Sequence, residues 1–330
     1  MLSLLSRRTL AAIPLLFGVA TLVFLALSLA PGDAASIYIR PGMSPEVVEQ
    51  VRQTFGLGDP LLVRYGKWLL AFVRGDLGYS HFYRMPVGSR IMVALPNTLI
   101  LGLVSLFLAF SLGTFIGVAQ AVRQGSLADS LLSGLSLFFY SVPSFWLALM
   151  LILIFSVGAD VLWEWPFSFP ASGLASPGAD LLGPWGRLQD RIHHLVLPAL
   201  TLTLILSGGV ARYVRSSMLE VIRQDYIRTA RAKGLPEWKV ILKHGLRNGL
   251  IPIVTLLGVY LPFILSGTVL IEYVFAWPGM GQLMVESIHR RDYPVVLAGT
   301  FVFGALVVMG NLLADLLYGV VDPRMRDPRG

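Results

Sequence analysis

The sequence contains no cysteine and few charged residues. The absence of cysteine among its 330 residues excludes disulfide frameworks, thiolate metal sites and cysteine nucleophiles. Charged residues make up only 14%, whereas soluble domains carry roughly 25%. Hydrophobic residues make up 55%, and the mean hydropathy is +0.71. This composition predicts an all-α integral membrane protein that is largely surrounded by lipid.

The motifs that carry catalytic chemistry are also missing. The chain has no G-x-x-x-x-G-K-[ST] loop for ATP phosphates, no G-x-S-x-G nucleophile turn and no H-E-x-x-H zinc motif. His193 and His194 are adjacent, so on a helix their rings point about 100° apart and do not form a metal pair. We therefore expect no catalytic residue, no metal site and no cofactor bound to this chain.

Long apolar runs predict about six membrane spans, because a bilayer core needs about 20 apolar residues of helix. We expect the first run to be retained as a membrane span, since it is longer than the roughly 7–15 apolar residues of a cleaved signal peptide. Pro143 should kink the third span. The expected spans are Thr9–Ala30, Asn97–Ala121, Leu127–Val157, Leu195–Tyr213, Gly249–Ile271 and Val295–Val321.

The positions of the charged residues predict the orientation of the chain. Lys and Arg outnumber Asp and Glu on the side that would carry both termini, and the two kinds are nearly balanced on the other side. The positive-inside rule then places both termini in the cytoplasm. The net charge of +7 is explained in this way, without nucleic acid as a partner.

The spans divide the chain into three parts. Residues 1–30 form the first transmembrane helix, and residues 31–95 an extracytoplasmic segment with short helices. One of these, Pro60–Val73, has an amphipathic pattern that suits the membrane interface. Residues 96–330 form a five-helix core with a cytoplasmic loop at 214–248. The stretch Gly158–His194 is rich in Gly, Pro and Trp, and we expect it to be a loop outside the bilayer.

Ionisable residues are scarce inside the spans, which argues against a proton-coupled carrier or an ion pump. Asp315 is the one candidate, and its position near a span end favours a boundary residue. The fifth span contains Pro252 and Pro262, and small residues on it could line a solute path. These candidates are Thr255, Gly258, Ser266 and Gly267, although close helix packing explains such residues better.

The loop Arg215–Thr255 is the most unusual segment. Apolar residues recur at three- and four-residue steps on both sides of Gly234-Leu235-Pro236, which predicts two short amphipathic helices. Gly234 suits a helix C-terminus, where φ is often positive, and Pro236 suits the first turn of the next helix. Such basic helices could lie on anionic lipid or could dock a soluble partner. The sharp joint favours docking.

The run YIRTARAKGLPEWKVILKHGLRNGLIP resembles the cytoplasmic signature loop of ATP-binding-cassette (ABC) importer permeases of the dipeptide/oligopeptide/nickel family. Arg228, Thr229, Ala230 and Gly234 stand at the motif positions. The resemblance extends in order through GDLGYS, HLVLPALTL, VFAWPGMGQL and NLLADLLYGVVDPRMR, and it fits the B-type subunit.

The resemblance implies a type I importer bundle in the inner membrane that has no ATPase of its own. A homologous C-type permease would pair with it, two cytoplasmic ATPases would hold ATP and Mg, and an extracytoplasmic binding protein would deliver the solute. Ala230, Arg231, Lys233, Gly234 and Leu235 would then form the ATPase-coupling site.

The cargo and three other functions stay open at this point. Dipeptides and longer peptides are expected, and nickel chelates or glutathione are the alternatives within the resemblance. A passive channel, a secondary carrier or an intramembrane enzyme are the alternatives outside it. A secondary carrier should show an inverted repeat with broken helices, and no such internal similarity is evident.

Overall fold

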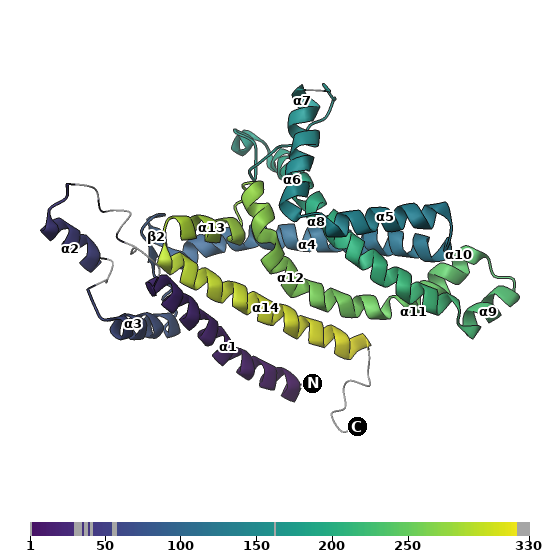
Figure 1. The fold of residues 1–330 in the computed structure, drawn as a ribbon, viewed down its shortest axis with the longest axis horizontal. Coiled ribbons are helices and arrows are strands. Elements are labelled where there is room, and N and C mark those ends of the chain that lie inside the picture. Colours follow the sequence, from purple (N-terminus) through teal and green to yellow (C-terminus); the bar gives the residue numbers. More distant parts are fainter. Residues whose placement is uncertain are drawn as a thin grey trace. The chain divides into compact units, whose positions relative to one another are not determined.

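The computed structural model describes residues 2–29, 35, 39, 42–54, 58–161 and 163–321, and they are almost entirely helical (Figure 1). The elements are α1 (Leu2–Leu29), α2 (Pro45–Thr54), α3 (Leu61–Val73), β1 (Tyr79–Ser80), β2 (Met85–Pro86), α4 (Val87–Val122), α5 (Leu127–Ser141), α6 (Ser144–Ile152), η1 (Leu153–Gly158), α7 (Ala159–Val161), η2 (Ala179–Leu181), α8 (Pro184–Ile222), α9 (Asp225–Ala232), α10 (Glu237–Lys239), η3 (Val240–Leu246), α11 (Arg247–Gly249), α12 (Ile251–Val274), α13 (Met280–His289) and α14 (Tyr293–Val321).

Several of these helices have the length and apolarity of membrane spans. Within the described residues, four helices meet both requirements, or five if a bent pair is counted as one span. The four are α1, α4, α8 and α14, which confirms the first, second, fourth and sixth predicted spans. The fifth predicted span coincides with α12, but side chains in much of that helix lie outside the described residues, so the count of six stays a prediction.

The third predicted span is broken rather than kinked. α5 and the continuous helix from Ser144 to Gly158 meet at an angle of 104°. Val142 has extended backbone angles and Pro143 begins the next helix, because proline disfavours a helical conformation in the residue before it. α6 then continues into η1, a π-helical turn of six residues. The sequence identified the proline but not the size of the bend.

Two helices extend well beyond their predicted spans. α4 begins at Val87 and passes through Pro96, although the second span was expected to begin after that proline. α8 begins at Pro184, so the last part of the expected loop Gly158–His194 is helical. Proline is favoured at the first helical position because its missing N–H would have no partner there. Hydropathy marks where a helix enters lipid and not where it begins.

The chain forms two compact units. Unit 1 consists of Thr98–Trp277 with the end of α14 from Met309, and unit 2 consists of the described residues of Leu2–Asn97 together with Pro278–Val308. Within residues 31–95, where short helices were predicted, unit 2 contains α2 and α3. The small hairpin β1–β2, which pairs Tyr79 with Pro86, was not predicted.

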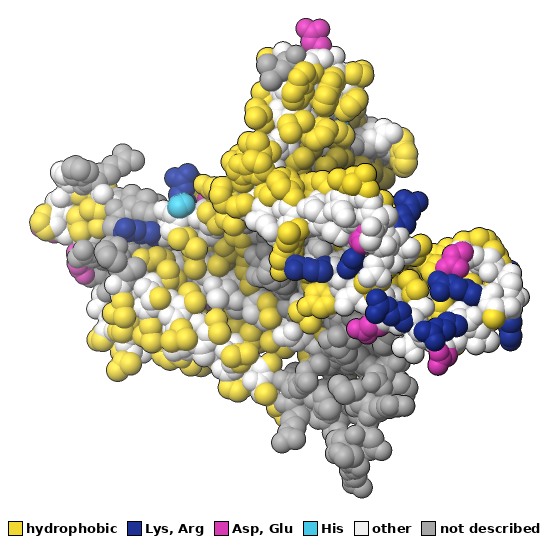
Figure 2. Space-filling view, turned by 45° about the vertical axis from the view of Figure 1, so that its right-hand side comes forward, with side chains coloured by type: hydrophobic (Ala, Val, Ile, Leu, Met, Phe, Trp, Pro, Cys, Tyr) yellow, Lys and Arg dark blue, Asp and Glu magenta, His cyan; other side chains and the backbone are white. Residues whose placement is uncertain are grey.

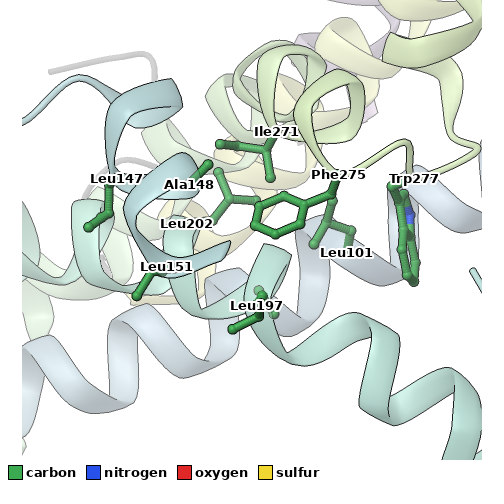
Figure 3. Packing of buried hydrophobic residues seen from close by; sticks show 10 residues of the cluster. Leu101, Leu147, Ala148, Leu151, Leu197, Leu202, Ile271, Phe275 and Trp277 are labelled. Atoms are coloured by element: carbon green, nitrogen blue, oxygen red, sulfur yellow. The ribbon is translucent and has the colours of Figure 1, made fainter. Parts of the chain in front are cut away.

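Unit 1 is built around the ring of Phe275. Figure 3 shows Leu101, Leu202 and Ile271 around this ring, within a cluster to which four helices and the segment after α12 contribute. The cluster contains Leu101 of α4, Leu147, Ala148 and Leu151 of α6, Leu197, Ala199 and Leu202 of α8, Ile271 of α12, and Trp277. A backbone hydrogen bond also holds the segment after α12, since Gly173 N–H donates to the Phe275 carbonyl at 2.9 Å.

Unit 2 is held by aromatic contacts and one buried polar pair. The ring of Phe72 on α3 lies 4.6 Å from that of Phe301 on α14, and Phe24 on α1 stacks on Trp68 at 5.4 Å. α3 is therefore fixed between α1 and α14 by its aromatic face. The hydroxyl of Ser80 donates a buried hydrogen bond to the carboxylate of Asp292, which ties the hairpin to the start of α14.

Candidate functional site at the helical joint

The joint between α9 and α10 is closed by backbone hydrogen bonds. Gly234 N–H donates to the Arg231 carbonyl at 2.9 Å, and Leu235 N–H donates to the Ala230 carbonyl at 3.4 Å. Together these bonds form a Schellman motif, which satisfies carbonyls that the end of a helix leaves without partners. Gly234 has a φ of +74°, a backbone conformation that residues with a Cβ atom rarely adopt. The predicted C-terminal glycine is confirmed.

A small apolar cluster supports the joint from within. Ile227 and Ala230 on α9 and Val240 at the start of η3 are buried, and Leu235 packs against them. In a Schellman motif the residue after the glycine commonly makes such an apolar contact. Ala230 and Leu235 therefore hold the two helices together.

One ion pair crosses the joint on its outer side. Arg231 donates to Glu237 through two atoms, Nη2 to Oε1 at 2.6 Å and Nε to Oε2 at 3.1 Å. The hydrogen bonds from Arg231 lower the pKa of the Glu237 carboxyl, and Glu237 raises the pKa of Arg231. The pair thus stays ionised at neutral pH and weakens only below the ordinary pKa of Glu237, 4.5. It connects α9 to α10 on the exposed side of the joint.

The joint is anchored to α8 by close contacts. Ser217 Oγ on α8 donates to the Gly249 carbonyl at 2.9 Å, and the buried side chain of Met218 packs beside Gly245 and Gly249. A Cβ added at Gly249 would lie 2.6 Å from Met218 Sδ. Gly245 of η3 and Gly249 of α11 leave room for Met218, so the helical segment that follows the joint packs directly against α8.

The outer face of the joint combines charge with exposed apolar side chains. Trp238 is 63% exposed and Leu242 is 53% exposed. In Figure 2, Lys and Arg side chains alternate with Asp and Glu at the right-hand end, where Figure 1 places α9 and α10. Apolar side chains ringed by charge are typical of a protein-docking surface.

The five predicted coupling residues lie together but differ in exposure. Gly234 and Lys233 are exposed, Arg231 is held by Glu237, Leu235 is half-buried and Ala230 is buried. Sequence reasoning missed Glu237, Trp238 and the support from Met218. The six-residue spacing of Arg231 and Glu237 across a Gly-Pro joint was a signal that could have identified the ion pair.

The other candidate residues belong to α12 and α14. Thr255, Gly258, Ser266 and Gly267 all belong to α12, and Gly258 is buried. The side chains of the other three, and that of Asp315 in α14, lie outside the described residues. Glu272 lies just beyond the predicted end of the fifth span at Ile271, yet it belongs to α12, is buried and accepts a hydrogen bond from Thr98 Oγ1 at 2.7 Å.

The histidine pair is structural. His194 is buried, with Nδ1 2.9 Å from the Asp190 carbonyl oxygen, and the His193 ring packs against Phe169. In the described part of the chain, no three His, Asp or Glu side chains gather as a metal site would require.

Two known protein families together match nearly the whole chain. Residues 109–327 match the family described as "Binding-protein-dependent transport system inner membrane component", and residues 1–102 match the N-terminal domain of the same kind of protein. The second match covers α1 to the first half of α4, and the first match covers the helical joint.

Two curated relatives align over nearly their full lengths. The chain is 44% identical to the oligopeptide transport system permease protein AppB of Bacillus subtilis, covering 97% of this chain and 98% of the relative. It is 38% identical to the dipeptide transport system permease protein DppB of Escherichia coli, covering 99% of each. Both lie well above the identity at which a fold is shared.

A solved structure supports the fold independently. The structure described as inward-facing conformations of the MetNI methionine ABC transporter matches with a TM-score of 0.53 and 20% identity. The match covers 70% of this chain and 96% of that one. At this identity the match shows a shared helical fold, that of a type I importer permease, and says nothing about cargo.

Proposed function

This chain belongs to the family of binding-protein-dependent transport system inner membrane components, and from that membership we propose that it carries peptides across the membrane as one permease subunit of an ABC importer. The two relatives described above are peptide permeases by name and align end to end. That full-length alignment is the observation that carries the proposed cargo.

The joint at Gly234 is proposed as the docking site for an ATPase subunit. Trp238 and Leu242 offer apolar contact area, and the surrounding charges would set the register of docking. Ala230 and Leu235 act from inside by holding the joint rigid, whereas Arg231, Lys233 and Gly234 lie at its surface. ATP and Mg would be bound by the ATPases and not by this chain.

The proposed assembly has five components. This chain would pair with a homologous C-type permease, two ATPases would dock on the joints, and an extracytoplasmic binding protein would deliver the peptide. Closure of the ATPase pair would push on the joints, and the contact of Met218 with Gly245 and Gly249 would pass that motion to α8. In this scheme the chain itself is not catalytic.

Affinity purification from native membranes followed by native mass spectrometry tests the proposal. Two ATPases, a sister permease and a binding protein that retains a peptide are expected with the tagged chain. A metal chelate or glutathione in the binding protein would replace the peptide cargo. Recovery of the chain alone, or as a homo-oligomer in several detergents, would contradict the importer and favour a channel or carrier.

A further inference from the structure

A cavity of about 320 Å³ lies within unit 1 between α4, α5 and α8. Its volume is at the lower end of the range for ligand pockets. At one place the helices that line it touch directly, since a Cβ added at Gly208 would lie 2.3 Å from the Ser136 carbonyl oxygen. The lining residues are Gln120, Ser133, Ser136, Leu137, Gly208, Arg212 and Arg215.

The two arginines of the cavity differ in their partners. Arg215 donates to both carboxylate oxygens of Asp129, so its charge is neutralised within the chain. Arg212 lies with its guanidinium carbon 4.5 Å from the centre of the Tyr140 ring. No carboxylate in the described residues pairs with Arg212. Arg212 is exposed, and among the described residues it is the one arginine of this cavity whose charge no carboxylate balances.

A charge in this position needs an explanation. Arg212 belongs to α8, one of the helices that are long and apolar enough to cross the membrane. Ionisable residues in such helices almost always face a water-filled cavity or a polar partner, because lipid solvates charge poorly. A cavity wall satisfies that requirement, and in transporters such residues mark solute paths.

Gln120 adds a second and independent feature. Its side chain is 1% exposed, and its amide nitrogen donates to Ser136 Oγ at 3.3 Å. Its amide oxygen accepts no hydrogen bond from the described residues. A buried acceptor without a donor is costly. Less than 1 Å² of this oxygen is accessible, so a rotation of the Gln120 amide would bring it to a ligand N–H and remove that cost.

We propose that this cavity is a solute-contact site that takes the C-terminal carboxylate of a peptide together with the amide N–H beside it. Arg212 donates to the carboxylate, and the Gln120 amide oxygen accepts the N–H. The single positive charge that Arg212 leaves uncompensated matches the single negative charge of the carboxylate. This inference rests on the proposed peptide cargo and assigns residues to it.

Two other anions share the chemistry of the carboxylate. An anionic lipid could present a phosphate to Arg212, and a partner permease could present an acidic side chain. Neither source needs the Gln120 acceptor. The experiment must therefore separate the three sources.

The test uses the complete transporter reconstituted in liposomes of neutral lipid with saturating binding protein. Uptake of a labelled tripeptide is compared with uptake of the same tripeptide carrying a C-terminal amide, for the wild type, Arg212→Gln, Arg212→Lys and Gln120→Met. Arg191→Gln is the matched control, because Arg191 is an exposed arginine of α8 outside the cavity. Co-purification of all subunits checks assembly of each variant.

Arg212→Gln should lower uptake of the tripeptide with a free C-terminal carboxylate by about tenfold or more, because charge-assisted hydrogen bonds contribute strongly to binding. Uptake of the tripeptide with a C-terminal amide should change less than twofold. Arg212→Lys should retain part of the preference, and Gln120→Met should reduce uptake of both peptides. Equal loss of both peptides in Arg212→Gln, or no loss, overturns the proposal.

Three further outcomes also overturn it, and each identifies a different cause. Loss of the sister permease from Arg212→Gln assigns Arg212 to the subunit interface. A wild type that needs phosphatidylglycerol for activity, with a requirement lost in Arg212→Gln, assigns it to lipid. A wild-type transporter that assembles and hydrolyses ATP but imports neither peptide, with or without phosphatidylglycerol, refutes the peptide cargo itself.

Discussion

Arg215 holds the carboxylate of Asp129 through two hydrogen bonds, Nε to Oδ1 at 3.0 Å and Nη2 to Oδ2 at 2.9 Å. The carboxylate also accepts the backbone N–H of Gly125 at 3.0 Å. These bonds fix the start of α5 against α8 across 86 residues of sequence. They also balance the charge of Arg215, which lines the cavity described above.

Asp129→Asn should lower the melting temperature of the purified protein by about 5 °C. The Asp129 side chain is 7% exposed and that of Arg215 is 32% exposed, so the substitution leaves a partly buried guanidinium without its counter-charge. Asp225→Asn is the control, because Asp225 is 95% exposed and its ion pair with Arg228 contributes little. Equal melting temperatures for Asp129→Asn and the control would contradict this account.

Gly117→Ala should destabilise the protein by about 1–3 kcal/mol, because the methyl group overpacks the contact between α4 and α8. The added Cβ would lie 2.5 Å from the Ala211 carbonyl oxygen and 2.6 Å from Val214 Cβ. The carbonyl belongs to the backbone of α8, which cannot shift away without a cost in free energy. Gly134→Ala on α5 is the matched control, since no atom lies within 4 Å of its added Cβ. Thermal unfolding in lipid nanodiscs measures both, and the control should be neutral or slightly stabilised.

Gly234→Pro should abolish ATP-driven transport while the membrane helices still assemble. Proline cannot reach a φ of +74°, and it removes the N–H that donates to the Arg231 carbonyl. Gly234→Asn should retain most activity, because asparagine tolerates left-handed angles and open space surrounds the position. ATP hydrolysis and peptide uptake are measured on the same liposomes. Normal uptake by Gly234→Pro would show that the joint does not couple the two.

The stability of unit 2 should fall as pH rises through the titration of Asp292. Burial raises the pKa of this carboxyl above its ordinary 3.8, although the hydrogen bond from Ser80 opposes the shift. A raised pKa in the folded state favours the protonated form, so its stabilising effect is complete below 3.8 and is lost as pH passes the raised value.

Asp292→Asn removes this titration and keeps an acceptor for Ser80. The variant should melt about 2 °C above the wild type at pH 7, and the difference should shrink near pH 4. Glu49→Gln, an exposed change on α2, should leave the melting curve unchanged at both values. A variant that melts below the wild type at pH 7 would show that the charged form of Asp292 is stabilising.

Features that depend on local backbone rules could be predicted from the sequence. The helical joint was predicted because Gly234 and Pro236 each suit a single backbone role and the apolar residues around them recur at helical spacing. The membrane spans were predicted because a helix of about 20 apolar residues has the length and hydrophobicity needed to cross the bilayer core. These signals lie within a few residues of the structure that they specify.

The tertiary structure decided the features that depend on distant residues. The size of the break at Pro143, the partner of Arg215 and the burial of Ala230 all depend on which helices meet, and no local pattern encodes that. The cavity is the clearest case, because Gln120, Ser136 and Arg212 come from three helices and look unremarkable in sequence. Only the packing of α4, α5 and α8 brings Arg212 and Gln120 to one site, where no described residue balances the charge of Arg212 or donates to the Gln120 amide oxygen.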